Sequence, residues 1–169
     1  PFPDRMNDQQ KYDVISKIEK ALKNAKFGKD IQLDKIEMEK LTDIEANALV
    51  ERRIISPAFA KNRIGRALFI SQDESVSILV NEEDHIRIQV LSNGSDLPVC
   101  LKIATEIDNF LDEKLLFAFD ETFGYLTQCP TNLGTGLRAS VMLHLPMMEN
   151  GRMIENLSNT VSKLGMTVR

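Results

Sequence analysis

Three acidic residues stand in a row between two segments of strongly β-forming residues, and an arginine follows them. The run is Asn-Glu-Glu-Asp-His-Ile-Arg at residues 81–87. A carboxylate matches the planar donor fork of a guanidinium with two parallel hydrogen bonds, so Glu82 and Glu83 could grip a guanidinium and accept its proton. Arg87 suits phosphate, and one hairpin could then serve both halves of a phosphoryl transfer. The alternative is a solvated turn in which Arg87 forms a cross-strand ion pair of little energetic value.

A loop rich in glycine, proline and asparagine is the second candidate. Its sequence is Cys-Pro-Thr-Asn-Leu-Gly-Thr-Gly-Leu-Arg at residues 129–138. Alone, the Gly-x-Gly is a weak phosphate-loop signal, because the Gly-Lys-Ser/Thr of a Walker pattern does not follow and the dinucleotide fingerprint is absent. Any phosphate held here would be bound by arginine side chains and loop amides. The alternative is an ordinary loop with a buried cysteine.

The two motifs together resemble the guanidino kinases, which comprise the phosphagen kinases (creatine kinase, arginine kinase) and the bacterial protein-arginine kinases. The resemblance runs from about Ser56 to the end of the chain, with weaker similarity at residues 1–3. Residues 81–89 and 138–146 look more like the protein-arginine kinase branch. Met142 also stands where phosphagen kinases have a histidine near the nucleotide base. The resemblance implies phosphoryl transfer from ATP to a guanidinium nitrogen, on arginine side chains of proteins.

The resemblance also implies roles for individual residues. The family's catalytic glutamate falls on Glu83, with Glu82 beside it, and would hold the guanidinium and take its proton. The family's cysteine falls on Cys129 and would contact the guanidinium as a thiolate. Two ATP-phosphate arginines fall on Arg87 and Arg138. Magnesium would be carried on the nucleotide phosphates, so we expect no dedicated protein metal cage. The remaining substrate-loop residues are Thr131, Asn132, Gly134 and Thr135.

Two alternatives to a protein-arginine kinase stay open. One keeps the reaction and changes the acceptor to a free guanidine such as arginine. The other is a non-catalytic fragment that recognises arginine or phosphoarginine, or that regulates a partner. By resemblance, partner proteins would be a transcriptional repressor, a protease-associated unfoldase and a small activator. Further phosphate-binding arginines of the family would fall outside the chain, so we expect a catalytic domain incomplete at both ends and inactive or weakly active alone.

Composition narrows the class of protein. The formal net charge is −4, whereas non-specific nucleic-acid binding usually needs a strongly basic surface. No apolar run approaches the ~20 residues that cross a bilayer. Cys100 and Cys129 are too few and too far apart for a zinc site or a disulfide framework. We therefore expect a cytoplasmic protein with reduced thiols and without nucleic-acid or membrane partners.

Hydrophobic spacing predicts the elements that position the two motifs. Capping-box patterns begin helices at Asn7 and at Thr42; the first is predicted to end at Gly28 and the second before Ser56. Short turns between strands indicate antiparallel pairing, and helices could cover one face of the sheet, which gives an α+β fold in a single partial domain over residues 1–169. Predicted strands span 31–38, 67–70, 75–80, 85–91, 125–128 and 140–145, further helices span 97–115 and 153–164, a turn spans 93–95, and 168–169 could begin another strand.

Overall fold

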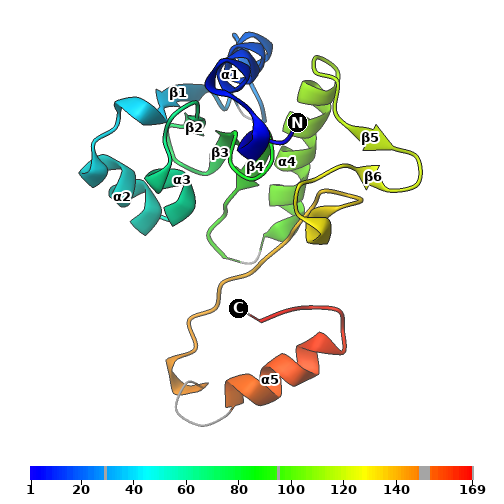
Figure 1. Cartoon of the computed structure of the whole chain (residues 1–169). Helices are drawn as coiled ribbons and strands as arrows, with labels where there is room; N and C mark the ends of the chain where they lie inside the picture. Colours follow the sequence, from blue (N-terminus) through cyan, green and yellow to red (C-terminus); the bar gives the residue numbers. More distant parts are fainter. Residues whose placement is uncertain (29, 95, 149–152, 169) are drawn as a thin grey trace. The chain divides into compact units, whose positions relative to one another are not determined.

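A four-stranded antiparallel sheet is the centre of the larger of two units. The computed structural model describes residues 1–28, 30–94, 96–148 and 153–168, and its contacts divide the chain into Pro1–Arg138 and Ala139–Arg169. The predicted α+β fold with antiparallel pairing is confirmed. Neighbouring strands in the sequence are neighbours in the sheet (Figure 1). Short turns such as residues 81–85 therefore place polar residues at the ends of strands. The strands are β1 (Leu33–Glu37), β2 (Ala67–Ser71), β3 (Val76–Val80) and β4 (Ile86–Val90).

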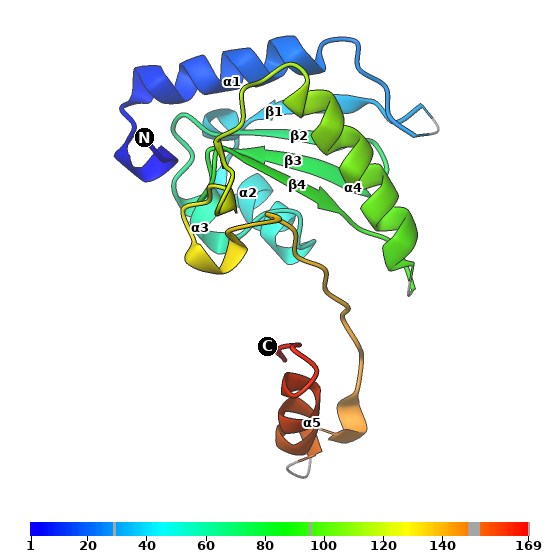
Figure 2. The same ribbon diagram turned by 90° about the vertical axis from the view of Figure 1, so that its right-hand side faces the viewer.

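Helices cover both faces of this sheet, so the prediction of a single covered face is wrong. Helices α1 (Asp8–Leu22) and α4 (Leu97–Asp112) pack on one face, and α2 (Asp43–Glu51) and α3 (Pro57–Lys61) pack on the other (Figures 1 and 2). The reason lies in β2, whose five residues are all buried. Successive side chains of a strand point to opposite faces, so an apolar strand of this kind needs a hydrophobic layer on each side.

Capping residues set the helix starts as the sequence predicted. The Asn7 side chain accepts from the Gln10 amide at 2.9 Å, and the Gln10 side chain accepts from the Asn7 amide at 3.0 Å. The predicted end of the first helix is wrong, because α1 ends at Leu22 rather than near Gly28. Asn24 adopts a left-handed backbone with φ of 60° and breaks the helical path. Gly28 instead lies in a small turn closed by paired backbone bonds between Phe27 and Ile31.

The second half of the chain holds less regular structure than predicted. Strands β5 (Phe119–Asp120) and β6 (Gly124–Tyr125), of two residues each, pair as a short antiparallel hairpin. Residues 126–128 therefore do not continue a strand, and 140–145 form none, because no backbone ladder among the described residues pairs with them. The final helix is confirmed as α5 (Met153–Ser162) in the second unit. Val168 is not in a strand; Ser95 of the predicted turn and Arg169 lie outside the described residues.

Candidate functional site

The acidic run forms the β3–β4 hairpin, and Asn81 fixes its shape. Asn81 adopts φ of 60°, a left-handed conformation that asparagine tolerates better than most residues. Its backbone N–H donates to the His85 carbonyl at 3.0 Å and closes the turn. Its side chain is 1% exposed and donates to the carbonyls of Lys11 at 3.1 Å and Gly65 at 2.9 Å. The hairpin is thereby anchored to α1 and to the loop before β2.

Glu82 lies inside this anchored hairpin and is fully engaged. Its side chain is only 10% exposed. One carboxylate oxygen accepts from the Ser56 hydroxyl at 2.6 Å, and the other accepts from Nη1 of Arg87 at 2.7 Å. Hydrogen bonds from a charged donor and from a hydroxyl on its two oxygens fix the orientation of this carboxylate. Glu82 is therefore placed to hold neighbouring groups rather than to face a ligand.

Arg66 adds positive charge behind Glu82, and the sequence patterns did not single it out. Its guanidinium lies 5.1 Å from the centroid of the Phe59 ring, and Nη1 donates to the Ala58 carbonyl at 2.9 Å. Burial lowers the pKa of the Arg66 guanidinium, and the negative charges of Glu82 and Asp4 oppose that shift. Arg87 alone forms an ion pair with Glu82 among the described residues, and Arg66 adds only its positive charge to the surroundings.

Glu83 differs from Glu82 in its exposure to solvent and in its contacts. It is exposed, and no hydrogen bond or ion pair joins its carboxylate to another of the described side chains. It is adjacent in sequence to Glu82, which holds Arg87. The Arg87 side chain is 49% exposed, so solvent and ligands can reach it. The hairpin thus carries a free carboxylate at Glu83 and, four residues later, a guanidinium held by Glu82.

The third acid of the hairpin ties the second motif to the first. Asp84 accepts from the backbone N–H of Gln128 at 2.7 Å. The Gln128 side chain donates to Asp4 at 2.7 Å, in the turn η1 (Pro3–Arg5). His85 donates from Nε2 to the Pro1 carbonyl at 3.0 Å, and burial lowers the pKa of its ring. The cysteine loop, the hairpin and the N-terminal segment are joined by these three bonds.

Cys129 directly follows Gln128, whose backbone amide donates to Asp84. Its thiol is partly buried and lies 3.0 Å from the Thr131 hydroxyl. Its carbonyl accepts from the Thr127 hydroxyl at 2.8 Å and from the Asn132 amide at 3.0 Å, which opens the short helix η3 (Pro130–Asn132). The hydrogen bonds to the Cys129 carbonyl fix the backbone at this residue, and the thiol itself contacts the Thr131 hydroxyl.

Two glycines let the rest of the loop return across β6. Tyr125 and Gly134 exchange backbone hydrogen bonds at 2.8 and 3.3 Å. A Cβ at Gly124 would come within 2.5 Å of the Gly134 carbonyl oxygen, so only glycine fits there. Beyond this bridge, the Thr135 hydroxyl accepts from the Leu137 amide at 3.3 Å. Arg138 is exposed, and within the described ranges no hydrogen bond or ion pair joins it to the hairpin.

The structure therefore brings together most, but not all, of the predicted site residues. Glu82, Glu83 and Arg87 share one hairpin, and Gln128 connects Cys129 to it. Local sequence patterns did not identify Ser56, Arg66 or Gln128 as neighbours of these residues. Ser56 precedes a proline, which is a helix-start signal, but nothing local shows that its hydroxyl also reaches Glu82.

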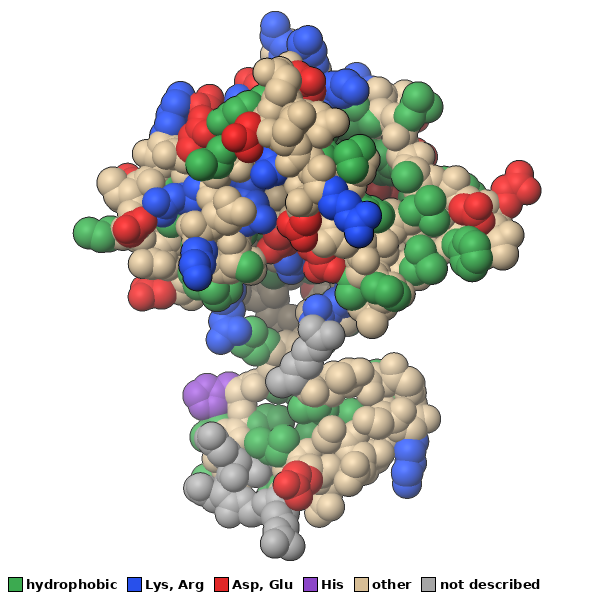
Figure 3. Space-filling model, viewed as in Figure 1, with side chains coloured by type: hydrophobic (Ala, Val, Ile, Leu, Met, Phe, Trp, Pro, Cys, Tyr) green, Lys and Arg blue, Asp and Glu red, His purple; other side chains and the backbone are tan. Residues whose placement is uncertain are grey.

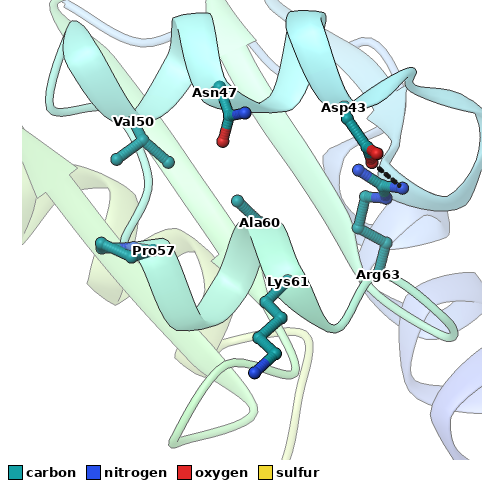
Figure 4. A pocket seen from close by; sticks show the side chains of 7 residues that line it. All are labelled: Asp43, Asn47, Val50, Pro57, Ala60, Lys61 and Arg63. Carbon is teal, nitrogen blue, oxygen red and sulfur yellow. Dashed lines mark hydrogen bonds and ion pairs between the residues drawn. The ribbon is translucent and has the colours of Figure 1, made fainter.

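The cavity between α2 and α3 lies apart from the hairpin and the cysteine loop. On the face shown in Figure 3, acidic and basic side chains are interspersed over the Pro1–Arg138 unit. A cavity of about 310 Å³ lies between α2 and α3, with the ion pair of Asp43 and Arg63 (2.8 Å) at one end (Figure 4). Its lining includes none of the hairpin or loop residues. Across the described ranges, no cluster of three or more His, Cys, Asp or Glu residues could hold a metal ion, and no helix is long and apolar enough to span a membrane.

Comparison with known proteins decides the family. The model of the ATP:guanido phosphotransferase C-terminal catalytic domain matches residues 13–169. The chain belongs to this family. Among its curated relatives, the protein-arginine kinase of Halothermothrix orenii is 44% identical over 169 residues, which cover 100% of this chain and 48% of the relative. That of Caldanaerobacter subterraneus subsp. tengcongensis is 46% identical over 170 residues, covering 100% of this chain and 50% of the relative.

Solved structures of guanidino kinases share the fold. The duplicated taurocyamine kinase of Schistosoma mansoni, with bound components of a transition-state analogue, matches with a TM-score of 0.74 and 26% identity over 94% of this chain and 24% of that one. Lombricine kinase matches with a TM-score of 0.77 and 23% identity, over 95% of this chain and 48% of that one. The chain spans about half the length of the curated relatives it matches.

Proposed function

We propose that this chain is part of an ATP-dependent kinase that phosphorylates arginine side chains of proteins, and that residues 1–169 belong to one catalytic domain. The observation that carries the proposal is that one hairpin holds an exposed Glu83 and an Arg87 whose guanidinium is held by Glu82 and whose side chain is half exposed. A carboxylate binds a guanidinium, and an arginine binds phosphate. The hairpin therefore offers one group for each substrate of the transfer. The curated relatives named protein-arginine kinase support the choice of acceptor.

In this proposal Glu83 aligns the acceptor guanidinium and takes the proton that its nitrogen loses. That nitrogen forms a bond to the γ-phosphorus of ATP while the bond from this phosphorus to the β–γ bridging oxygen breaks, and ADP leaves with the electron pair. Arg87 neutralises the charge on the transferring phosphoryl group. Catalysis of this kind depends on alignment and charge neutralisation, which the braced hairpin supplies.

The second motif completes the acceptor side. Cys129 would contact the guanidinium, with Thr131, Asn132, Gly134 and Thr135 shaping the loop around it. Arg138 would add a second phosphate contact. Magnesium would arrive on the nucleotide and supply further charge neutralisation at the phosphates. A cytoplasmic location, and partners such as a repressor, an unfoldase and an activator, are part of the proposal and rest on the family resemblance.

The test compares this chain with a version extended to the length of its relatives. Each is incubated with Mg-ATP and an arginine-rich protein, with free arginine in competition, and acid-labile phosphoarginine is followed by phosphorus NMR. We expect phosphoarginine on the protein from the extended version. Phosphorylation of free arginine alone would change the acceptor to a small guanidine. Absence of any product from a folded protein that binds Mg-ATP would replace the kinase by a binding role.

A further inference from the structure

Ser56 occupies the N-cap of α3 and also contacts the catalytic hairpin. Its Oγ accepts from the Phe59 amide at 3.1 Å, as an N-cap oxygen does. The same hydroxyl lies 2.6 Å from Oε1 of Glu82. A hydroxyl has one proton to give; since the amide contact uses it as an acceptor, that proton goes to the carboxylate.

Because Ser56 fixes the Glu82 carboxylate, it also restricts the Arg87 guanidinium that donates to that carboxylate. With Oε1 fixed by Ser56, the second oxygen Oε2 accepts from Nη1 of Arg87 at 2.7 Å. Glu82 is nearly buried, whereas the Arg87 side chain is half exposed. A long arginine side chain has many rotamers in water, and fixing one of them costs conformational entropy. A carboxylate locked at its far end reduces the freedom of the guanidinium before any ligand arrives.

We propose that Ser56 is a positioning residue for Arg87, acting through Glu82 to hold the guanidinium in the orientation that meets the transferring phosphoryl group. The purpose of this arrangement rests on the proposed kinase function, whereas the coupling itself does not. The two glutamates then have different roles. Glu82 orients the phosphate-binding arginine, and Glu83 binds the acceptor guanidinium. Preorganised charge of this type lowers the barrier of the transfer because no reorganisation is needed during the reaction.

Three substitutions separate positioning from helix capping. Ser56→Gly removes the hydroxyl but keeps a residue that caps helices with only a small loss. Ser56→Thr keeps both the capping oxygen and the donor. Thr42→Gly is the matched control, because the Thr42 hydroxyl likewise accepts from an amide (Glu45, 3.3 Å) and donates to a carboxylate (Glu45, 2.8 Å) at the N-cap of α2. The control makes the same chemical change without contacting Glu82.

The first readout needs no activity. In the ¹⁵N-arginine-labelled chain, we expect Ser56→Gly to shift the Arg87 side-chain resonances and to speed rotation of its guanidinium, while Ser56→Thr and Thr42→Gly leave them unchanged. In the extended protein, Ser56→Gly should lower kcat about tenfold and change the KM for the acceptor less than about twofold, as loss of a transition-state contact does. Ser56→Thr should restore kcat.

The outcomes distinguish the coupling from the function. Arg87 resonances that stay unchanged in Ser56→Gly, or a kcat loss equal to that of Thr42→Gly, would overturn the positioning role. Arg87 resonances that respond, in an extended protein that binds Mg-ATP but phosphorylates no guanidine, would keep the coupling and overturn the proposed function instead.

Discussion

Removal of the Asp84 carboxylate should release the cysteine loop from the hairpin. The bond from the Gln128 amide to Asp84, at 2.7 Å, joins two segments that are 44 residues apart. A hydrogen bond to a charged acceptor contributes about 1.5–3 kcal/mol. Asp84→Ala should therefore raise the open population of the loop by about 10- to 150-fold, since 1.4 kcal/mol corresponds to tenfold in an equilibrium constant.

Hydrogen exchange and thiol alkylation measure this opening directly. The Gln128 amide should exchange faster by that factor in Asp84→Ala, and Cys129 should be alkylated faster while Cys100 on α4 keeps its rate. Asp84→Asn, which keeps an oxygen acceptor without the charge, should give a smaller effect. Asp73→Ala is the matched control, because Asp73 accepts from the Ser75 amide at 3.1 Å in a different turn. An unchanged Gln128 exchange rate in Asp84→Ala would refute the reasoning.

Three further predictions concern the scaffold. Gly124→Ala should lower the free energy of unfolding by at least about 1–2 kcal/mol, because Gly124 has φ of 74° and its Cβ would strike the Gly134 backbone; urea denaturation checks this. Asn81→Asp should lower the free energy of unfolding by about 2–5 kcal/mol at pH 8, because it replaces two buried N–H donors by a carboxylate that faces carbonyls. The loss should be smaller at pH 5, where that carboxylate is more readily protonated. Urea denaturation that gives an equal loss at both pH values would contradict this. Burial lowers the pKa of His85 below its ordinary 6.5, so its contribution to stability should be present above pH 6.5 and be lost as pH falls below it. Urea unfolding of His85→Gln between pH 7.5 and 5 should show a weaker pH dependence than the parent, and an equal one would count against the assignment.

Local patterns sufficed for the four-stranded sheet and for the starts of α1 and α2, but they did not predict α3. The capping boxes at Asn7 and Thr42 are formed, because their partners lie within one turn of the helix. The alternation of β4 places Ile88 against one helix layer and leaves Arg87 on the opposite face. The predicted strand at 140–145 is absent, because an alternating sequence becomes a strand only where a neighbouring strand completes its hydrogen bonds.

The arrangement of the site depended on contacts that local patterns do not contain. The sequence placed Glu82 and Glu83 together as similar acids, yet one is buried and the other exposed. The difference comes from Ser56, 26 residues earlier, which reaches Glu82 once α3 packs on the sheet. Gln128 likewise contacts Asp84 only after the chain has crossed α4 and the β5–β6 hairpin. Long-range pairing therefore decided which acid faces solvent.

Phosphotransfer by Glu83→Gln in the extended protein decides whether Glu83 takes part in the reaction, and the control is Glu51→Gln, which changes an exposed glutamate of α2. We predict that Glu83→Gln keeps the fold and Mg-ATP binding but loses nearly all phosphoarginine formation, while Glu51→Gln retains it. Unchanged turnover in Glu83→Gln would remove Glu83 from the mechanism and contradict the account.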